Sequence, residues 1–178
     1  IGTTAITFPY TTDITADISF RYIVFDGDFN ANFASATWAE IQKVSLAGLT
    51  ADLYGDQVGT TKAITLKNGK TMTLRLANAT NDMYQLSDGS GTTGLVMEFV
   101  DLWADTKYMN SSNTNSGGWN NSYMRKTVMP LILEQLPDDL AAVLATVNIK
   151  GCNSGTSGTI NTSADKLFLP AEREIFAS

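Results

Sequence analysis

The stretch "KAITLKNGKTMTLRL", residues 62–76, is the strongest structural signal in the chain. Two runs of alternating apolar and polar residues flank the pair Asn68-Gly69. Alternation with a period of two is typical of a strand with one buried face, and Asn-Gly is the preferred pair for a two-residue type I′ turn. The stretch therefore predicts an antiparallel hairpin with a tight turn. The residues expected on its buried face are Ile64, Leu66, Met72, Leu74 and Leu76.

A helix is predicted just before this hairpin. Thr37 and Glu40 have the spacing of a capping box, in which each side chain accepts a hydrogen bond from the other residue's backbone N–H. Gly48 is well placed to end the helix just after its C-cap. The apolar residues that would share one face are Trp38, Ile41 and Val44.

The segments on either side of the helix and hairpin complete a mixed α+β pattern. Residues 1–35 contain "TAITFPY" and "DISFRYIVF", which are rich in β-branched and aromatic residues. They predict an N-terminal β segment or linker that joins the domain to a preceding module or to a neighbouring subunit. The apolar run at 95–103 fits a strand or a helix. The separate groups of helices and strands predict an α+β domain over residues 36–178.

The C-terminal third is predicted to begin with helices and to end with a short strand. A helix is expected from about Asn121, with Pro130 kinking or restarting it, and Pro137 fits the first position of the next helix. "GCNSGTSGTINTS" reads as a polar loop and "DKLFL" as a short buried strand. Pro170 is expected to start a last helical turn.

The composition excludes several kinds of chemistry. The chain of 178 residues has no histidine and one cysteine, Cys152, so Ser-His-Asp catalysis, His-ligated zinc and an intrachain disulfide are all excluded. Cys152 could be a reactive thiol, but a single cysteine without a nearby base is more often a small filler residue. The net charge is −6 and there is no basic run, which argues against nucleic-acid binding. No apolar run reaches the length of a membrane span.

The acidic residues do not predict a metal or catalytic site. Asp26, Asp28 and Asn30 alternate as in a calcium loop, but Ala31 stands where that loop needs glycine and Thr37 where it needs a glutamate. Glu172 and Glu174 are two residues apart, so they would point to different sides of a helix. No catalytic residue, metal ligand or cofactor is therefore expected.

The stretch "SGGWNNSYMRKTVMP", residues 116–130, leaves two interpretations open. In one, Trp119 stacks on a sugar ring while Asn120 and Asn121 bind its hydroxyl groups. In the other, which the local pattern favours, Trp119 is a hydrophobic staple before a helix. Asn120 or Asn121 then caps that helix, and Arg125 pairs with a carboxylate.

Three separated segments resemble a domain family of unassigned function that is frequent in gut Firmicutes and their phages. They are "TWAEIQKVSLAGLTADLYGDQVGTTKAITLKNG", "GGWNNSYMRKTVMPLILEQLPDDLAAVL" and "TSADKLFLPAEREIF". The resemblance covers residues 36–178. It implies a divergent C-type lectin-like fold of the kind seen in formylglycine-generating enzymes, used for recognition on phage tails or cell surfaces.

The resemblance implies framework roles rather than catalytic ones. Trp119, Ser122 and Arg125 match the family's helix motif. The matches to its strand-and-turn motif are Asp165, Lys166, Phe168, Leu169 and Glu174. The related enzymes need a pair of active-site cysteines, which this chain lacks. The family's motif is followed by a further "W-W-x-R-S-P" stretch, so a chain that stops at Ser178 implies either a longer protein or a sheet that a partner completes.

These observations predict a non-enzymatic recognition or structural module of a phage tail or baseplate, located in the virion and attached to a host-surface glycan or protein. The alternative is a bacterial cell-surface adhesin or carbohydrate-binding module, located outside the cell. A homo-oligomer or a neighbouring virion or surface subunit is the expected partner. The candidate ligand-binding residues are Trp119, Asn120 and Asn121. The expected structural residues are Trp38, Trp119, Arg125, Asp165 and Phe168.

Overall fold

The computed structural model describes residues 30–103, 106–153 and 158–170. Its first helix, α1 (Trp38–Leu46), begins at the predicted capping box. The backbone N–H of Glu40 donates to Thr37 Oγ1 at 3.3 Å, and that of Thr37 donates to Glu40 Oε2 at 2.6 Å. Because the hydrogen bonds from Thr37 favour the charged form, they lower the pKa of Glu40. The helix ends at Leu46, Ala47 is its C-cap and Gly48 follows with a φ of +71°, so both predicted ends are confirmed.

The second helix and the turn that follows it contact residues 31–33, near the start of the described chain. α2 (Thr50–Tyr54) continues into a 3-10 turn, η1 (Gly55–Gln57). The side chain of Gln57 accepts from the backbone N–H of Phe33 at 2.8 Å and donates to the carbonyl of Ala31 at 2.7 Å. The Phe33 ring meets Tyr54 edge-on, with ring centroids 5.8 Å apart.

The predicted hairpin is present, but its turn differs from the expectation. β1 (Thr61–Thr65) pairs antiparallel with β2 (Thr71–Asn78), and Ile64 lies opposite Met72. Leu66 N–H donates to the carbonyl of Lys70, which leaves a three-residue loop closed by Gly69 at φ +83°. A type I′ turn would need a positive φ at Asn68 as well, and Asn68 does not have one. The predicted type I′ turn is therefore wrong.

The buried face explains why the three-residue loop is used. A two-residue loop would shift the strand register by one position, which would place Ile64 opposite Thr73 instead of Met72. Such a shift moves the side chains of one strand to the other face of the sheet. In the observed register the predicted apolar face is confirmed, because all its members are at most 5% exposed: Ile64, Leu66, Met72, Leu74 and Leu76.

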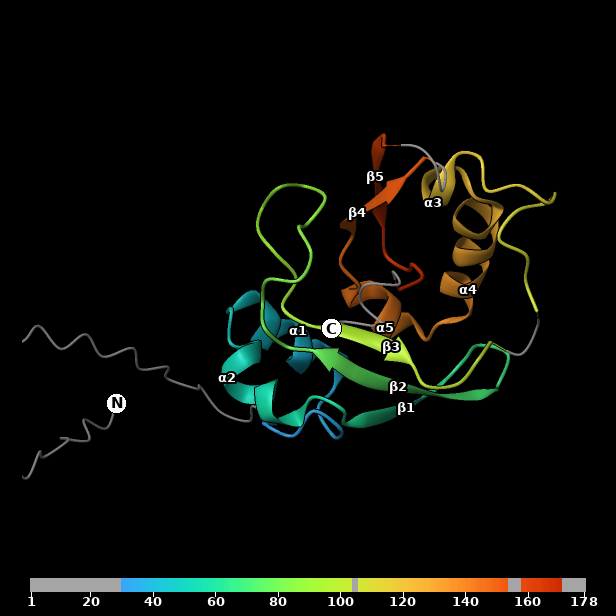
Figure 1. Cartoon of the computed structure of the whole chain (residues 1–178). Coiled ribbons are helices and arrows are strands. Elements are labelled where there is room, and N and C mark those ends of the chain that lie inside the picture. The colour runs from blue at the N-terminus through green and yellow to red at the C-terminus, as the bar shows by residue number, and fades with distance from the viewer. Residues whose placement is uncertain (1–29, 104–105, 154–157, 171–178) are drawn as a thin grey trace, which may run out of the picture.

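The main core lies between the three-stranded sheet and the helices that cover it. β3 (Val96–Phe99) extends the sheet in the order β1-β2-β3. α1 and α5 (Asp138–Val143) contact each other and pack their apolar residues against the sheet's buried face (Figure 1). Of the strand and the helix that the sequence leaves open for residues 95–103, the structure has the strand.

A second, smaller sheet stands above the first, with helical segments beside it (Figure 1). β4 (Val147–Cys152) and β5 (Ile160–Asp165) form an antiparallel hairpin. The outer edge of β4 pairs with a loop through an isolated bridge between Val147 and Leu86. Two predictions are therefore wrong. "GCNSGTSGTINTS" contains parts of both strands rather than one loop, and the strand expected in "DKLFL" ends at Asp165.

The helical region before this hairpin is also more broken than predicted. A short turn, α3 (Gly118–Asn121), precedes a π-helical segment, η2 (Met124–Val128), and α4 (Met129–Gln135) follows directly. Pro130 lies in the first turn of α4, where the π-helical segment gives way to an α-helix, so the expected change in the helix at this proline is present. Pro137 is the N-cap residue of α5 rather than its first helical residue.

The mixed α+β class is confirmed by these two antiparallel sheets and their helices. Several predictions fall outside the described residues: nearly all of the N-terminal β segment, the pair Asp26 and Asp28, and the helical turn after Pro170 with Glu172 and Glu174. Asn30 is described, and its side-chain oxygen accepts from the backbone N–H of Asn32 at 3.0 Å, as in an ordinary Asx turn.

Candidate functional site

Asp165, the last residue of β5, joins the second sheet to the helical region. Its Oδ2 accepts a hydrogen bond from the indole Nε1–H of Trp119 at 2.9 Å and another from Ser163 Oγ at 2.6 Å. Its Oδ1 accepts from Arg125 Nε at 2.7 Å, which makes an ion pair. The Asp165 side chain is 8% exposed and that of Arg125 is 21% exposed. Both oxygens of this buried carboxylate have hydrogen-bond donors within the chain, as buried polar groups require. The cluster therefore has a structural role: it connects the second sheet to the helical region.

Ser122 caps the helix that carries Arg125. Its backbone is extended, with φ −64° and ψ 148°, and its Oγ accepts from the backbone N–H of Arg125 at 3.1 Å. The same hydroxyl donates to the carbonyl of Trp119 at 2.9 Å, and Ser122 is fully buried. The prediction that Asn120 or Asn121 caps this helix is therefore wrong. Trp119 is not a staple residue either, because it lies inside α3 and is held by Asp165.

The glycine pair before Trp119 is required by the geometry. Gly117 and Gly118 have φ values of +85° and +54°, a region that L side chains rarely adopt. A Cβ on Gly118 would lie 1.8 Å from the carbonyl oxygen of Cys152 at the end of β4. The pair therefore lets the chain turn sharply and brings α3 into contact with the second sheet.

The candidate ligand residues have partners within the chain. The indole N–H of Trp119 is bonded to Asp165, and the backbone carbonyl of Asn120 accepts from Arg125 Nη1 at 3.1 Å. The side-chain oxygen of Asn121 accepts from Lys126 Nζ at 2.7 Å. These contacts hold the two ends of the segment Gly118–Lys126 together, which makes it a rigid support for its neighbours.

A hollow that the sequence analysis did not single out lies beside this support. Its volume is about 380 Å³. Its lining is a continuous stretch of chain, Tyr108, Met109, Asn110, Ser111, Ser112, Asn113 and Thr114. No lining residue carries a charge at neutral pH. Tyr108 is 79% exposed, so its ring is open to a ligand. The signal that could have found this hollow is "YMNSSNTN", an aromatic residue at the start of a polar amide and hydroxyl loop.

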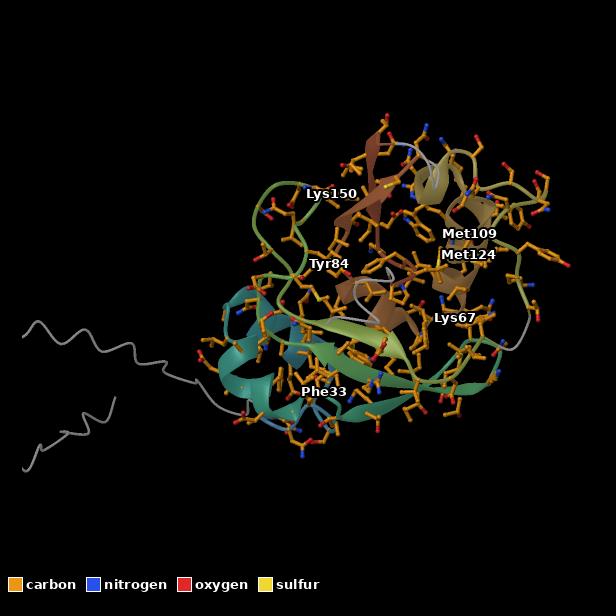
Figure 2. The ribbon with its side chains drawn as sticks, viewed as in Figure 1. Phe33, Lys67, Tyr84, Met109, Met124 and Lys150 are labelled. Atoms are coloured by element: carbon orange, nitrogen blue, oxygen red, sulfur yellow. The ribbon has the colours of Figure 1, made fainter. Side chains whose placement is uncertain are left out.

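The loop that forms the hollow is fastened to the capped helix. The backbone N–H of Met124 donates to the carbonyl of Met109 at 3.0 Å, and Figure 2 shows the two methionines next to each other. The side-chain oxygen of Asn110 accepts from the backbone N–H of Tyr123 at 3.1 Å, while its Nδ2 donates to the carbonyl of Thr114 at 2.7 Å. These bonds hold Met109 and Asn110 against the start of the helix, and Asn110 in turn holds the far end of the loop at Thr114.

A second depression lies where η2 and α4 face the end of β5. This groove has a volume of about 420 Å³. Its charged lining residues are Arg125, Lys126, Asp165 and Lys166, and its apolar ones include Met129, Pro130, Leu133 and Leu167. Arg125 and Asp165 pair with each other, so the two lysines supply the unbalanced charge of the groove.

The other expected structural residues lie away from these hollows. Trp38 is 5% exposed in the core, and the ammonium of Lys62 lies 5.2 Å from the centre of its ring. Burial lowers the pKa of Lys62, and the charges of Glu40 and Asp139 oppose that shift. Phe168 meets Tyr84 edge-on, with ring centroids 5.0 Å apart.

Cys152 is exposed at the end of β4, so its interpretation as a filler residue is wrong.

Within residues 30–103, 106–153 and 158–170, no three acidic, cysteine or histidine side chains gather as a metal site would require. Nor does any helix in that part of the chain have the length and hydropathy to cross a bilayer.

The chain was compared with protein-family models, with curated proteins and with solved structures, and none of them matches it.

Proposed function

We propose that this chain is a non-enzymatic recognition module of a phage tail or baseplate, with a C-type lectin-like α+β core, and that it binds a host-surface glycan. The observation that carries the proposal is the uncharged hollow of residues 108–114. It combines one open aromatic ring with a series of amide and hydroxyl groups. Neutral sugars present C–H faces that pack on aromatic rings and hydroxyl groups that pair with such polar groups.

The rigidity of the support favours recognition. A binding loop that is already held in place loses less conformational entropy when its ligand binds. Here the hollow is fixed to η2 by Met109 and Asn110, and η2 is fixed to β5 through Arg125 and Asp165. Binding residues on loops held by a rigid scaffold are a common arrangement in recognition proteins.

The proposal that the module is non-enzymatic rests on the distribution of its carboxyl groups. Acid and base catalysis needs titratable groups that converge on a reacting atom. Among the described lining residues, the hollow has no carboxylate and the groove has one, Asp165, which is bonded to three donors within the chain. The resemblance of residues 36–178 to a family of recognition domains supports the same reading and favours the lectin-like core.

A glycan array probed with the full chain tests this function. We expect the wild-type chain to bind a subset of neutral glycans, and Tyr108→Ala to lower that affinity about tenfold or more, because an open aromatic ring often supplies much of a binding energy. Its melting temperature should stay within about 2 °C of the wild type, since exposed substitutions change stability little.

The matched control for this variant is Leu46→Ala. Leu46 is 80% exposed on α1, close to the value for Tyr108, so it removes a similarly exposed apolar side chain from another surface. We expect its array pattern to match the wild type. Equal binding by Tyr108→Ala and wild type, or no bound glycan at all, would count against the proposal.

A further inference from the structure

The groove between η2, α4 and the end of β5 is positively charged in a chain that is acidic as a whole. Among the described residues, its lining holds three cations, Arg125, Lys126 and Lys166, and one carboxylate, Asp165, which leaves a net charge of +2. The whole chain carries −6. A local field of opposite sign to the rest of the protein attracts anions to that place.

Among the residues that the structure describes, the two lysines in the groove donate to neutral oxygens only. Lys126 Nζ donates to the side-chain oxygen of Asn121 at 2.7 Å, and Lys166 Nζ donates to the carbonyl of Ala141 at 3.5 Å. Within the described residues, neither forms an ion pair. Two cations elsewhere in the described chain do have carboxylate partners: Lys67 pairs with Asp138, and Arg75 with Glu98. Both ammonium groups therefore have donors left for an incoming anion.

A π-helical segment sets the position of the cations. η2 (Met124–Val128) contains Arg125 and Lys126, and the first residues of α4 follow it without a break. A π turn inserts residues relative to a regular helix and changes the direction of the side chains after it, and such turns are frequent at functional sites. Here Arg125, Lys126, Met129 and Pro130 all line the same groove.

The uncharged part of the lining suits a compact ring. Pro130, Leu133 and Leu167 provide an apolar surface, and the groove's volume of about 420 Å³ is within the usual range for small-ligand sites. A uronic or sialic acid residue has both features that this lining would recognise. It carries a carboxylate for the lysines and C–H groups for the apolar surface.

We propose that this groove binds an acidic sugar residue of a glycan, with the sugar carboxylate held by Lys126 and Lys166. The inference rests on the proposed glycan recognition and names a second ligand class for it. The hollow of residues 108–114 takes a neutral sugar and the groove takes an acidic one. Both depressions adjoin η2, because Met109 and Asn110 bond to its start and Arg125 and Lys126 lie within it.

A sugar suits the groove better than an acidic peptide does. Peptides often bind as an added strand, which needs free backbone groups along a sheet edge. In the groove the carbonyl of Ala164 on β5 accepts from Arg125 Nη2 at 3.4 Å, and Arg125 stands beside Asp165. The side chain of Arg125 therefore already occupies this end of the β5 edge.

The test is a calorimetric or NMR titration of the full chain with two acidic saccharides, digalacturonate and 3′-sialyllactose, and with their methyl esters. The esters keep the sugar rings but remove the charge. We expect at least one acid to bind, its ester to bind about tenfold more weakly, and the affinity to fall as salt is added. Lys126→Gln and Lys166→Gln should each weaken binding about three- to tenfold.

Lys70→Gln is the matched control, because it makes the same charge change in the exposed turn of the β1–β2 hairpin. Its affinity should stay within about twofold of the wild type.

Binding of neither acid, or equal binding of acid and ester, would overturn the inference. So would binding of tetraglutamate in preference to both sugars. If neutral glycans still bind through Tyr108 when the acids fail, only this inference is lost. If no glycan of either kind binds, the proposed function fails as well.

Discussion

Replacing Asp165 by asparagine is expected to lower the free energy of unfolding by about 3 kcal/mol, near the lower end of the cost of breaking a buried ion pair. Asparagine has one acceptor oxygen where Asp165 uses two, so at least one of its donors loses its partner. Arg125 also loses its counter-ion, although its 21% exposure lets water offset part of that cost. Urea denaturation of the two chains measures the difference.

Glu98→Gln provides the matched control for this change. It also converts a carboxylate paired with an arginine into an amide, but Arg75 and Glu98 are 49% and 40% exposed. Exposed pairs of this kind contribute about 0–1 kcal/mol, so we expect a small effect. If Asp165→Asn cost no more than Glu98→Gln, Asp165 would not be the residue that connects the second sheet to the helices.

Replacing Gly118 by alanine is expected to be comparably severe. The positive φ of Gly118 costs an alanine about 1–2 kcal/mol. The new Cβ would also lie 1.8 Å from a backbone oxygen of Cys152, which cannot turn aside as a flexible side chain would. Overpacking of this kind adds about 1–3 kcal/mol, so we expect a total of about 3 kcal/mol or more in a denaturant titration.

The control for this variant is Gly69→Ala in the hairpin turn. Gly69 also has a positive φ, +83°, but a Cβ there would meet nothing within 4 Å. It therefore carries the backbone cost without the collision and should lose about 1–2 kcal/mol. Equal losses in the two variants would mean that α3 moves away from β4 at little cost, and the close packing described here would be wrong.

The parts of the fold that the sequence predicts well are those with strong local signals. The capping box of Thr37 and Glu40 fixes the start of α1, and the alternation in residues 62–76 fixes the buried face of the hairpin. The turn type was wrong because Asn68-Gly69 favours a two-residue loop locally, while the buried face requires a different register. The burial of five apolar side chains outweighs the preference of one dipeptide.

The second sheet could not be predicted from hydrophobic periodicity. Its buried residues on β5 are Ser163 and Asp165, which are polar and are held by hydrogen bonds. A strand whose inner face is polar has no alternating apolar pattern, so the segment reads as a loop. The same contact explains the misplaced strand in "DKLFL". Asp165 was expected to begin a strand, but it ends one because Trp119 and Arg125 bind it there.

The site proposed here lies in the same region as the predicted ligand residues Trp119, Asn120 and Asn121, but it uses other side chains. Local pattern alone left Trp119 between a ligand role and a structural role, because its partner lies far along the chain at Asp165. Once that contact is known, Tyr108 is the most exposed described aromatic residue of the region, at 79% against 43% for Tyr123. The hollow of residues 108–114 was missed because it depends on bonds from Met109 and Asn110 to η2.

The most direct test of this account is the NMR spectrum of the full chain as a glycan selected on the array is added. If the glycan binds in the hollow, we expect the amide signals of residues 108–114 to shift. The indole N–H signal of Trp119 should stay in place, because this group remains bonded to Asp165. Binding in the hollow would be contradicted if the largest shift occurred at the Trp119 indole and the signals of residues 108–114 did not move.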